Sequence, residues 1–307
     1  MGWHSLFGVI LPYTAVLLFV VGFIHRILKW ASSPVPFHIP TVSGQQKSLP
    51  WIKANNIDSP STAGGVIARL ALEILLFRSL LRNEKVESRG PERLLFKTST
   101  YLWLGAIAFH WSLLVILLRH LRFFLEPVPS VIVFVQGLDS ILQGLLPVLY
   151  LTDMIILIAL GYLFLRRVVS PQIRYISLAP DYFVILMILA IAATGILMRL
   201  VYKADLEKVK EWAMAMLRFH PRLPEGVGLL FYVHLFFASL LIAYFPFSKL
   251  MHMGGIFLSP TKNLRNRSRH ERHINPWDHP VKAHSYGQYE EEFRQSMKEV
   301  GLPVEKE

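Results

Sequence analysis

Residues 94–125 read LLFKTSTYLWLGAIAFHWSLLVILLRHLRFFL, and this apolar run decides the fold because it is long enough to cross a bilayer. It carries two histidines, His110 and His120, inside the predicted span. An ionisable side chain near the centre of a spanning helix costs roughly 2.5–3.5 kcal/mol on insertion scales, so it usually persists only with a partner, a cavity or a cofactor. We therefore expect the function to lie at these histidines.

The composition predicts a polytopic membrane protein. Hydrophobic residues make up 53 % of the 307 residues, and the mean hydropathy is +0.42. The net charge of +11 does not indicate nucleic acid, because the basic residues lie at the ends of apolar segments and in loops, where they face the lipid interface. The absence of cysteine excludes disulfides, thiolate-held iron–sulfur clusters and covalent c-type haem in this chain.

Five membrane spans are predicted from the apolar runs. Twenty-four of the 32 lysines and arginines then fall on one side, which by the positive-inside rule places the N-terminus outside and the C-terminus in the cytoplasm. Arg26 and Lys29 follow the first apolar run instead of preceding it, so we expect a retained span and not a cleaved signal peptide. The expected spans are 6–28, 94–120, 146–167, 180–202 and 226–249.

The expected fold class is all-α: five transmembrane helices bundled around two b haems in the cytoplasmic (inner) membrane. Residues 1–258 form the membrane domain and include a cytoplasmic segment, 31–93. Within that segment, 60–83 predicts a helix lying along the membrane surface, with docking of a cytoplasmic partner as the alternative. Residues 131–144 are too short to span, and 205–219 place apolar residues at helical spacing, so both are expected to cover the outer face.

The C-terminal tail, residues 259–307, is polar and basic and is expected in the cytoplasm. A short helix is predicted over 288–300, ending before Gly301 and Pro303. Its apolar stripe, which includes Phe293 and Met297, has little core of its own to enter. We therefore expect the tail to pack on a partner subunit.

The histidine spacings predict two ligand pairs. His234 and His252 are 18 residues apart, which is five full turns, so they share one helix face. His110 and His120 are ten apart and lie about 80° from each other around their helix. Because the second and fifth spans run in opposite directions, His120 pairs with His234 on the outer side and His110 with His252 on the inner side. Two bis-histidine, non-covalent b haems are expected, with these residues as iron ligands.

The two spacings do not match in length. Ten residues of helix rise about 15 Å and 18 residues about 27 Å, so a straight fifth span cannot align both pairs. Pro246 offers a kink before His252. The competing interpretation is four histidines hydrogen-bonded within the bundle. Zinc or di-iron is disfavoured, because carboxylates are scarce near these positions and the pairs lie at different depths.

Other polar residues near the predicted outer pair are candidates for secondary roles. Asp139 and Asp153 are candidate acceptors of quinol protons, with helix-end hydrogen bonding as the alternative for Asp153. His220, before Pro221, is a candidate quinone contact. Three arginines are candidate contacts for haem propionates or a quinone, with snorkelling to the interface as the equal alternative: Arg119, Arg122 and Arg199.

The paired histidines give the chain a family resemblance. A His-x9-His pair in the second span and a His-x17-His pair in the fifth resemble the membrane cytochrome b, or gamma, subunit of respiratory nitrate reductase over about residues 1–258. Within this superfamily, GGVIARLALEILLFRSLLRN and the NPWDHP of the tail are similar to the DsrM subunits of DsrMKJOP complexes and their HmeC-type relatives. No residue matches the lysine that helps bind quinol in the nitrate reductase subunit.

The resemblance implies an electron-transfer subunit of a menaquinol oxidoreductase in sulfur or sulfite metabolism. Its expected substrate is menaquinol, and its expected partner is a cytoplasmic iron–sulfur subunit of the DsrK type, related to heterodisulfide reductase. Further membrane subunits and a multihaem cytochrome c are expected beside them. One alternative is the gamma subunit of a nitrate reductase. Another is a haem-free membrane anchor or transporter subunit.

Overall fold

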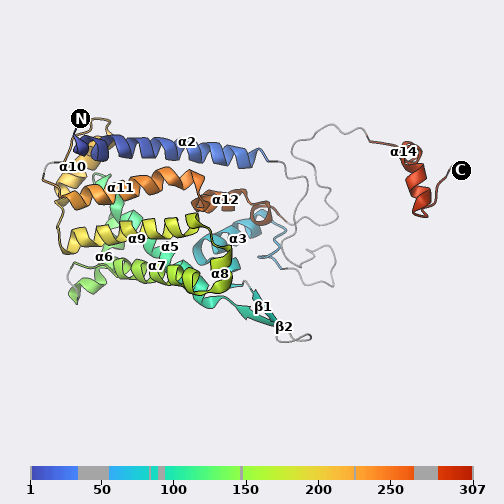
Figure 1. The fold of residues 1–307 in the computed structure, drawn as a ribbon, viewed down its shortest axis with the longest axis horizontal. Coiled ribbons are helices and arrows are strands. Elements are labelled where there is room, and N and C mark those ends of the chain that lie inside the picture. Colours follow the sequence, from blue (N-terminus) through green and yellow to red (C-terminus); the bar gives the residue numbers. More distant parts are fainter. Residues whose placement is uncertain are drawn as a thin grey trace.

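Long helices packed side by side form the body of the protein (Figure 1). The computed structural model describes residues 2–33, 55–82, 84–88, 94–145, 148–224, 226–265 and 283–305. Parts of the predicted cytoplasmic segment and of the tail therefore lie outside the described residues. Four helical stretches are long and apolar enough to cross a membrane, which fits an integral membrane protein: Trp3–Ala31, Thr100–Phe123, Ala179–Leu200 and Leu229–Phe247.

The elements follow the apolar segments of the sequence. The first span is α1 (Trp3–Ser5), a π-helical turn (Leu6–Ile10) and α2 (Leu11–Ala31). The remaining helices are α3 (Ala63–Leu76), α4 (Arg78–Leu81), α5 (Thr100–His120), α6 (Ser130–Asp139), α7 (Leu151–Val169), α8 (Pro171–Ile176), α9 (Ala179–Leu200), α10 (Leu206–Leu217), α11 (Leu229–Tyr244), α12 (His252–Leu258), α13 (Pro260–Asn263) and α14 (Tyr286–Glu299).

One predicted span begins later than expected. Residues 94–98, taken as the start of the second span, form strand β2 (Leu94–Thr98), which pairs antiparallel with β1 (Glu84–Ser88). The helix starts only at Thr100, so the prediction of a span from 94 was wrong. The reason is local: three apolar residues precede Lys97, and a Gly-Pro pair at 90–91 favours a turn that lets the two segments pair. The described chain is thus helical apart from this hairpin.

The predicted third span corresponds to α7, which differs from the other long helices. It has 19 residues and carries Asp153, Arg166 and Arg167, so it is less apolar than the four spanning stretches. Its middle is buried in the bundle, since Leu160 is 1 % exposed and packs with Ile188 of α9. A span count of five therefore stays a prediction.

The fifth span is interrupted before His252, near the proline where the sequence predicted a kink. Helix α11 ends at Tyr244, and two short 3-10 turns separated by an extended Ser248 precede α12. Pro246 supplies the break because it lacks the amide hydrogen and its ring is incompatible with continued α-helix. The interruption removes the length mismatch between the two histidine spacings.

The short helix α10 (Leu206–Leu217) covers one end of the bundle. Helix α10 buries Val209, Trp212, Ala213 and Met216, which confirms the predicted stripe except for the exposed Leu206. The Trp212 indole donates a hydrogen bond to the Gly8 carbonyl at 2.9 Å. Figure 1 shows α10 beside the N-terminus at the left, with α12 and α3 at the opposite end and α14 away from the bundle.

Candidate functional site

The structure brings the four predicted histidines together in two pairs, matching the pairs predicted from the sequence. The rings of His110 on α5 and His252 at the start of α12 have centroids 6.0 Å apart. The rings of His120 on α5 and His234 on α11 are 6.5 Å apart and nearly parallel. We refer to the two ends of the bundle as the His110 end and the His120 end.

Each of the four rings has its Nδ1 nitrogen bonded to an oxygen. Nδ1 lies 2.8 Å from the Ala106 carbonyl in His110, 2.7 Å from Ile116 in His120 and 2.8 Å from Lys249 in His252. A carbonyl oxygen only accepts, so Nδ1 carries the proton of each neutral ring. The Nε2 lone pair then remains available, which is the arrangement that metal-binding histidines adopt.

The fourth ring, that of His234, also carries its proton on Nδ1, and there the partner is a side chain of α9. The Thr194 hydroxyl lies 2.8 Å from the Ala190 carbonyl and 2.9 Å from Nδ1 of His234. Its single proton goes to the carbonyl, so the hydroxyl oxygen accepts from Nδ1–H of the histidine. Gly195 lets α9 approach closely, because a Cβ at this position would lie 3.3 Å from Cε1 of His234.

The distance between the paired rings fits a metal held between two imidazoles. Imidazole nitrogens bind first-row metals at about 2.0–2.1 Å and lie about 1.1 Å from the ring centre, so trans ligands put the centroids about 6.2–6.4 Å apart. The observed 6.0 and 6.5 Å lie close to that value. His120 and His252 are also exposed. The residues present therefore fit a bis-histidine haem at each level.

Other metals find less support among the described residues. No group of three or more histidine, cysteine, aspartate or glutamate side chains is close enough to hold a metal ion in the described part of the chain. A structural zinc site takes four protein ligands, and carboxylate di-iron sites need more than one glutamate. The two separate pairs suit a cofactor that brings its own equatorial ligands, as a porphyrin does.

An aromatic residue that the sequence analysis did not single out adjoins the His110 pair. Phe77 lies between α3 and α4 in the left-handed conformation, with φ 47° and ψ 47°. Its ring meets that of His110 edge to face, with centroids 4.8 Å apart. The only sequence signal was the break in helical periodicity after Leu76. The pairing of Phe77 with His110 spans 33 residues and is invisible in any local pattern.

At the His120 end, the predicted arginines and aspartates form a buried ion network. Arg119 places Nε 3.1 Å from Asp139 and Nη2 3.1 Å from Asp153. Arg199 bonds the second oxygen of Asp153 at 3.2 Å, and both guanidinium groups stack on Tyr150, at 3.7 and 3.8 Å from its ring centroid. The charges of these four groups cancel, so the network can exist in an apolar bundle.

The two aspartates of this network also accept hydrogen bonds at the start of α7. Asp153 accepts the backbone amide of Tyr150, and Asp139 accepts the amide and hydroxyl of Thr152. The helix-end hydrogen bonding predicted as one of two roles is therefore present. Arg122 bonds Gln136. Within the described residues, Nη1 of Arg119 is buried with no hydrogen-bond partner, so it still has a proton to donate.

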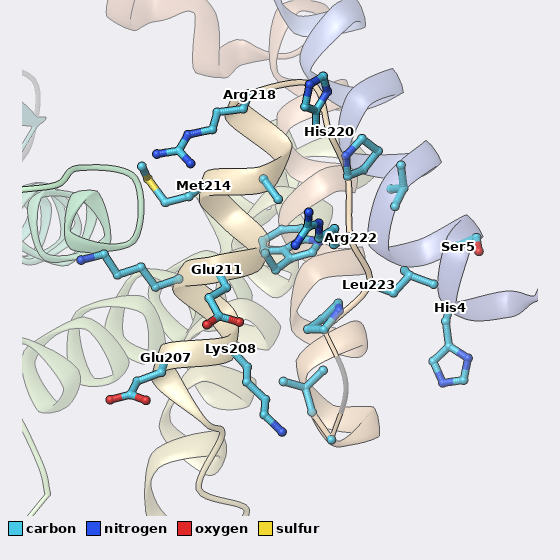
Figure 2. A pocket seen from close by; sticks show the side chains of 18 of the residues that line it. His4, Ser5, Glu207, Lys208, Glu211, Met214, Arg218, His220, Arg222 and Leu223 are labelled. Carbon is cyan, nitrogen blue, oxygen red and sulfur yellow. The ribbon is translucent and has the colours of Figure 1, made fainter.

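His220, the predicted quinone contact, lies apart from both histidine pairs in a wide cavity at the His120 end. The cavity has a volume of about 1730 Å³ and lies between α10, the chain after it and the N-terminal helix (Figure 2). Its rim is charged, with Glu207, Glu211 and Arg222 among the residues that Figure 2 labels, and Trp212 and Tyr232 line it deeper. His220 itself is exposed and bonds the carbonyl of its neighbour.

Comparison with known proteins gives consistent results. The family pattern described as nitrate reductase gamma subunit matches residues 65–270. A protein of Archaeoglobus fulgidus named Hdr-like menaquinol oxidoreductase cytochrome b-like subunit is 45 % identical over 280 residues, covering 89 % of this chain and 83 % of that protein. A protein of the same name from Archaeoglobus profundus is 41 % identical over 277 residues, covering 87 % and 81 %.

Proposed function

Because this chain belongs to the nitrate reductase gamma subunit family, we propose that it is the dihaem cytochrome b subunit of a menaquinol oxidoreductase complex. It takes electrons from menaquinol and passes them through the membrane to a cytoplasmic iron–sulfur subunit of the heterodisulfide reductase type. Sulfur or sulfite metabolism is the proposed setting. The names of both relatives favour this assignment over the gamma subunit of a nitrate reductase, which would co-purify with a molybdenum protein.

The observation that carries the proposal is the pair of facing histidine sets. His110 with His252, and His120 with His234, would each hold one b haem through Nε2, since every Nδ1 proton is already donated. Each haem would supply a one-electron carrier. The attachment is non-covalent because the chain has no cysteine. The two pairs lie about 15 Å apart along α5, so electrons would cross the membrane in short steps.

We place menaquinol oxidation at the His120 end. The large cavity and His220 lie there, and the unbonded Nη1 of Arg119 is available to a propionate or a quinone oxygen. Arg122 and Arg199 remain proposed contacts of the same kind. In the orientation given by the positive-inside rule, this end faces outward, and the C-terminal tail reaches the cytoplasmic partner.

The proposal predicts that a water-soluble menaquinol analogue reduces the b bands of the purified complex. Stopped-flow absorbance would record the rate, and a His220→Ala variant would show whether this side chain contributes, as a lower rate at unchanged haem content. Reduction by dithionite but not by any quinol, in a complex that retains its iron–sulfur subunit, would contradict the proposed function.

Thr194 is predicted to hold His234 in its ligand state. In Thr194→Val a methyl group replaces the hydroxyl that accepts from Nδ1–H of His234. Loss of such a partner typically costs roughly 10- to 100-fold in affinity for the bound group. We expect weaker retention and an altered midpoint potential of one haem only, measured by redox titration of the b bands. Thr194→Ser keeps the hydroxyl and should behave as wild type. Equal behaviour of both variants would refute the role.

A further inference from the structure

The short helices α3 and α4 form a hairpin whose packing differs from that of a surface helix. Phe77 in the left-handed conformation separates them, and its ring touches His110, which lies at the middle of α5. Asp58, before α3, forms ion pairs with Arg78 of α4 and with Arg82 just after it. Burial alone would raise the pKa of Asp58, but hydrogen bonds from Arg82 and Asn55 and the charge of Arg78 outweigh it, so the pKa lies below its ordinary value. The segments before and after the hairpin are thus tied together.

Two indole groups satisfy the carbonyls at the end of α3. Trp103 donates to the Leu76 carbonyl at 2.7 Å, and Trp111 donates to the Leu75 carbonyl at 3.0 Å. The last carbonyls of a helix have no partner within it and normally face water. Trp111 lies 11 residues after Thr100, about 16 Å along α5. The end of α3 therefore lies beside the spanning part of α5, where hydrocarbon offers no hydrogen bonds.

The distribution of polar and apolar side chains on α3 is the reverse of that on a surface helix of a soluble protein. Its charged side chains face the protein, with Arg69 4 % and Glu73 8 % exposed. Glu73 accepts from the Ser79 amide and from Lys262 of α13, both at 3.0 Å. The opposite face is apolar and exposed, as shown by Ile67 at 68 % and Leu75 at 49 %. Such an arrangement is stable where the surroundings are apolar.

We propose that α3 and α4 form a re-entrant hairpin, which enters the membrane at the His110 end and leaves on the same side. The exposed face of α3 contacts lipid acyl chains. Lipid is the occupant because this face adjoins α5, a spanning helix whose side chains Leu104 and Leu114 are themselves exposed. The re-entrant hairpin requires only that the chain is inserted in a membrane. It does not depend on whether the chain binds haem.

The absence of cysteine makes a direct test simple. Single variants Ile67→Cys, Ile74→Cys and Leu75→Cys of the full chain, purified with its co-purifying subunits, would be placed in lipid nanodiscs. Leu17→Cys, on the exposed apolar face of α2, serves as the lipid control, and Glu207→Cys, in the charged cavity, as the water control. The two readouts are labelling by a membrane-impermeant maleimide, and quenching of a bimane label by phospholipids brominated at different depths.

The re-entrant hairpin predicts loss of maleimide labelling at all three sites relative to Glu207→Cys, with quenching comparable to Leu17→Cys. Leu75→Cys should be quenched by deeper bromines than Ile67→Cys. Equal, shallow quenching at both would show a helix lying on the surface and overturn the proposal. Labelling like that of Glu207→Cys, or neither labelling nor quenching because another subunit covers the face, would also overturn it.

Discussion

Replacing His110 or His252 with alanine is expected to remove the same one of two b haems from each chain. The centroids of the two rings lie 6.0 Å apart and both Nδ1 protons are donated elsewhere, so on the proposed function both residues would hold the same haem. The double variant should lose no more haem than either single variant, since loss of one ligand already removes the group. Variants of His120 and His234 should lose the other haem. Pyridine haemochrome assays of the purified proteins measure these losses.

The crossed double variant gives the sharpest distinction between pairings. His110→Ala combined with His120→Ala should lose both haems, because the two residues serve different levels. His220→Ala is the matched control, since His220 is exposed, bonds the Phe219 carbonyl and belongs to neither pair, and it should retain both haems. The pairing would be wrong if His110→Ala and His252→Ala removed different haems. The two haems would be told apart by the position of their α-bands and by their midpoint potentials.

Asp153→Ala is expected to destabilise the protein more than any other single change at the His120 end. Asp153 neutralises both Arg119 and Arg199, and its side chain is 8 % exposed. Removing one partner of a buried ion pair leaves uncompensated charge and typically costs about 3–5 kcal/mol. Denaturant or SDS titration in detergent would measure the loss in free energy of unfolding.

Glu126→Gln provides the control for this effect. Glu126 pairs with Lys210, and its side chain is 62 % exposed, so solvent already screens the charge. Exposed pairs contribute about 0–1 kcal/mol, and a small change is expected. Comparable losses for Asp153→Ala and Glu126→Gln would contradict a buried network. A second check is Arg199→Gln in the Asp153→Ala background, which should recover part of the stability by removing one uncompensated charge.

The histidine pairs were predictable because they rest on helical periodicity. An 18-residue spacing returns to the same face, and antiparallel spans then fix which histidines meet. Pro246 pointed to the interruption that removes the length mismatch, although two 3-10 turns were not foreseeable from one proline. The α10 stripe was predictable for the same reason. Helix spacing is local information that a single sequence contains.

The contacts that could not be predicted join residues remote in sequence. Arg119 and Arg199 were expected at propionates or the interface, but Asp153 engages both, across 34 and 46 residues. The sequence predicts a helix along the membrane surface over 60–83, whereas its charged residues Arg69 and Glu73 are buried against the protein. A charge in a helix pattern indicates polarity but not which partner neutralises it. The β-hairpin was missed because its second strand is apolar and runs directly into a span.

The most direct test of the account is the haem content of the wild-type protein. A dithionite-reduced minus oxidised visible spectrum, with pyridine haemochrome quantitation on the purified chain and its partners, should give two b haems per chain. The absence of b-type absorption from a folded protein that retains its partner subunits would contradict the account and favour a haem-free membrane anchor.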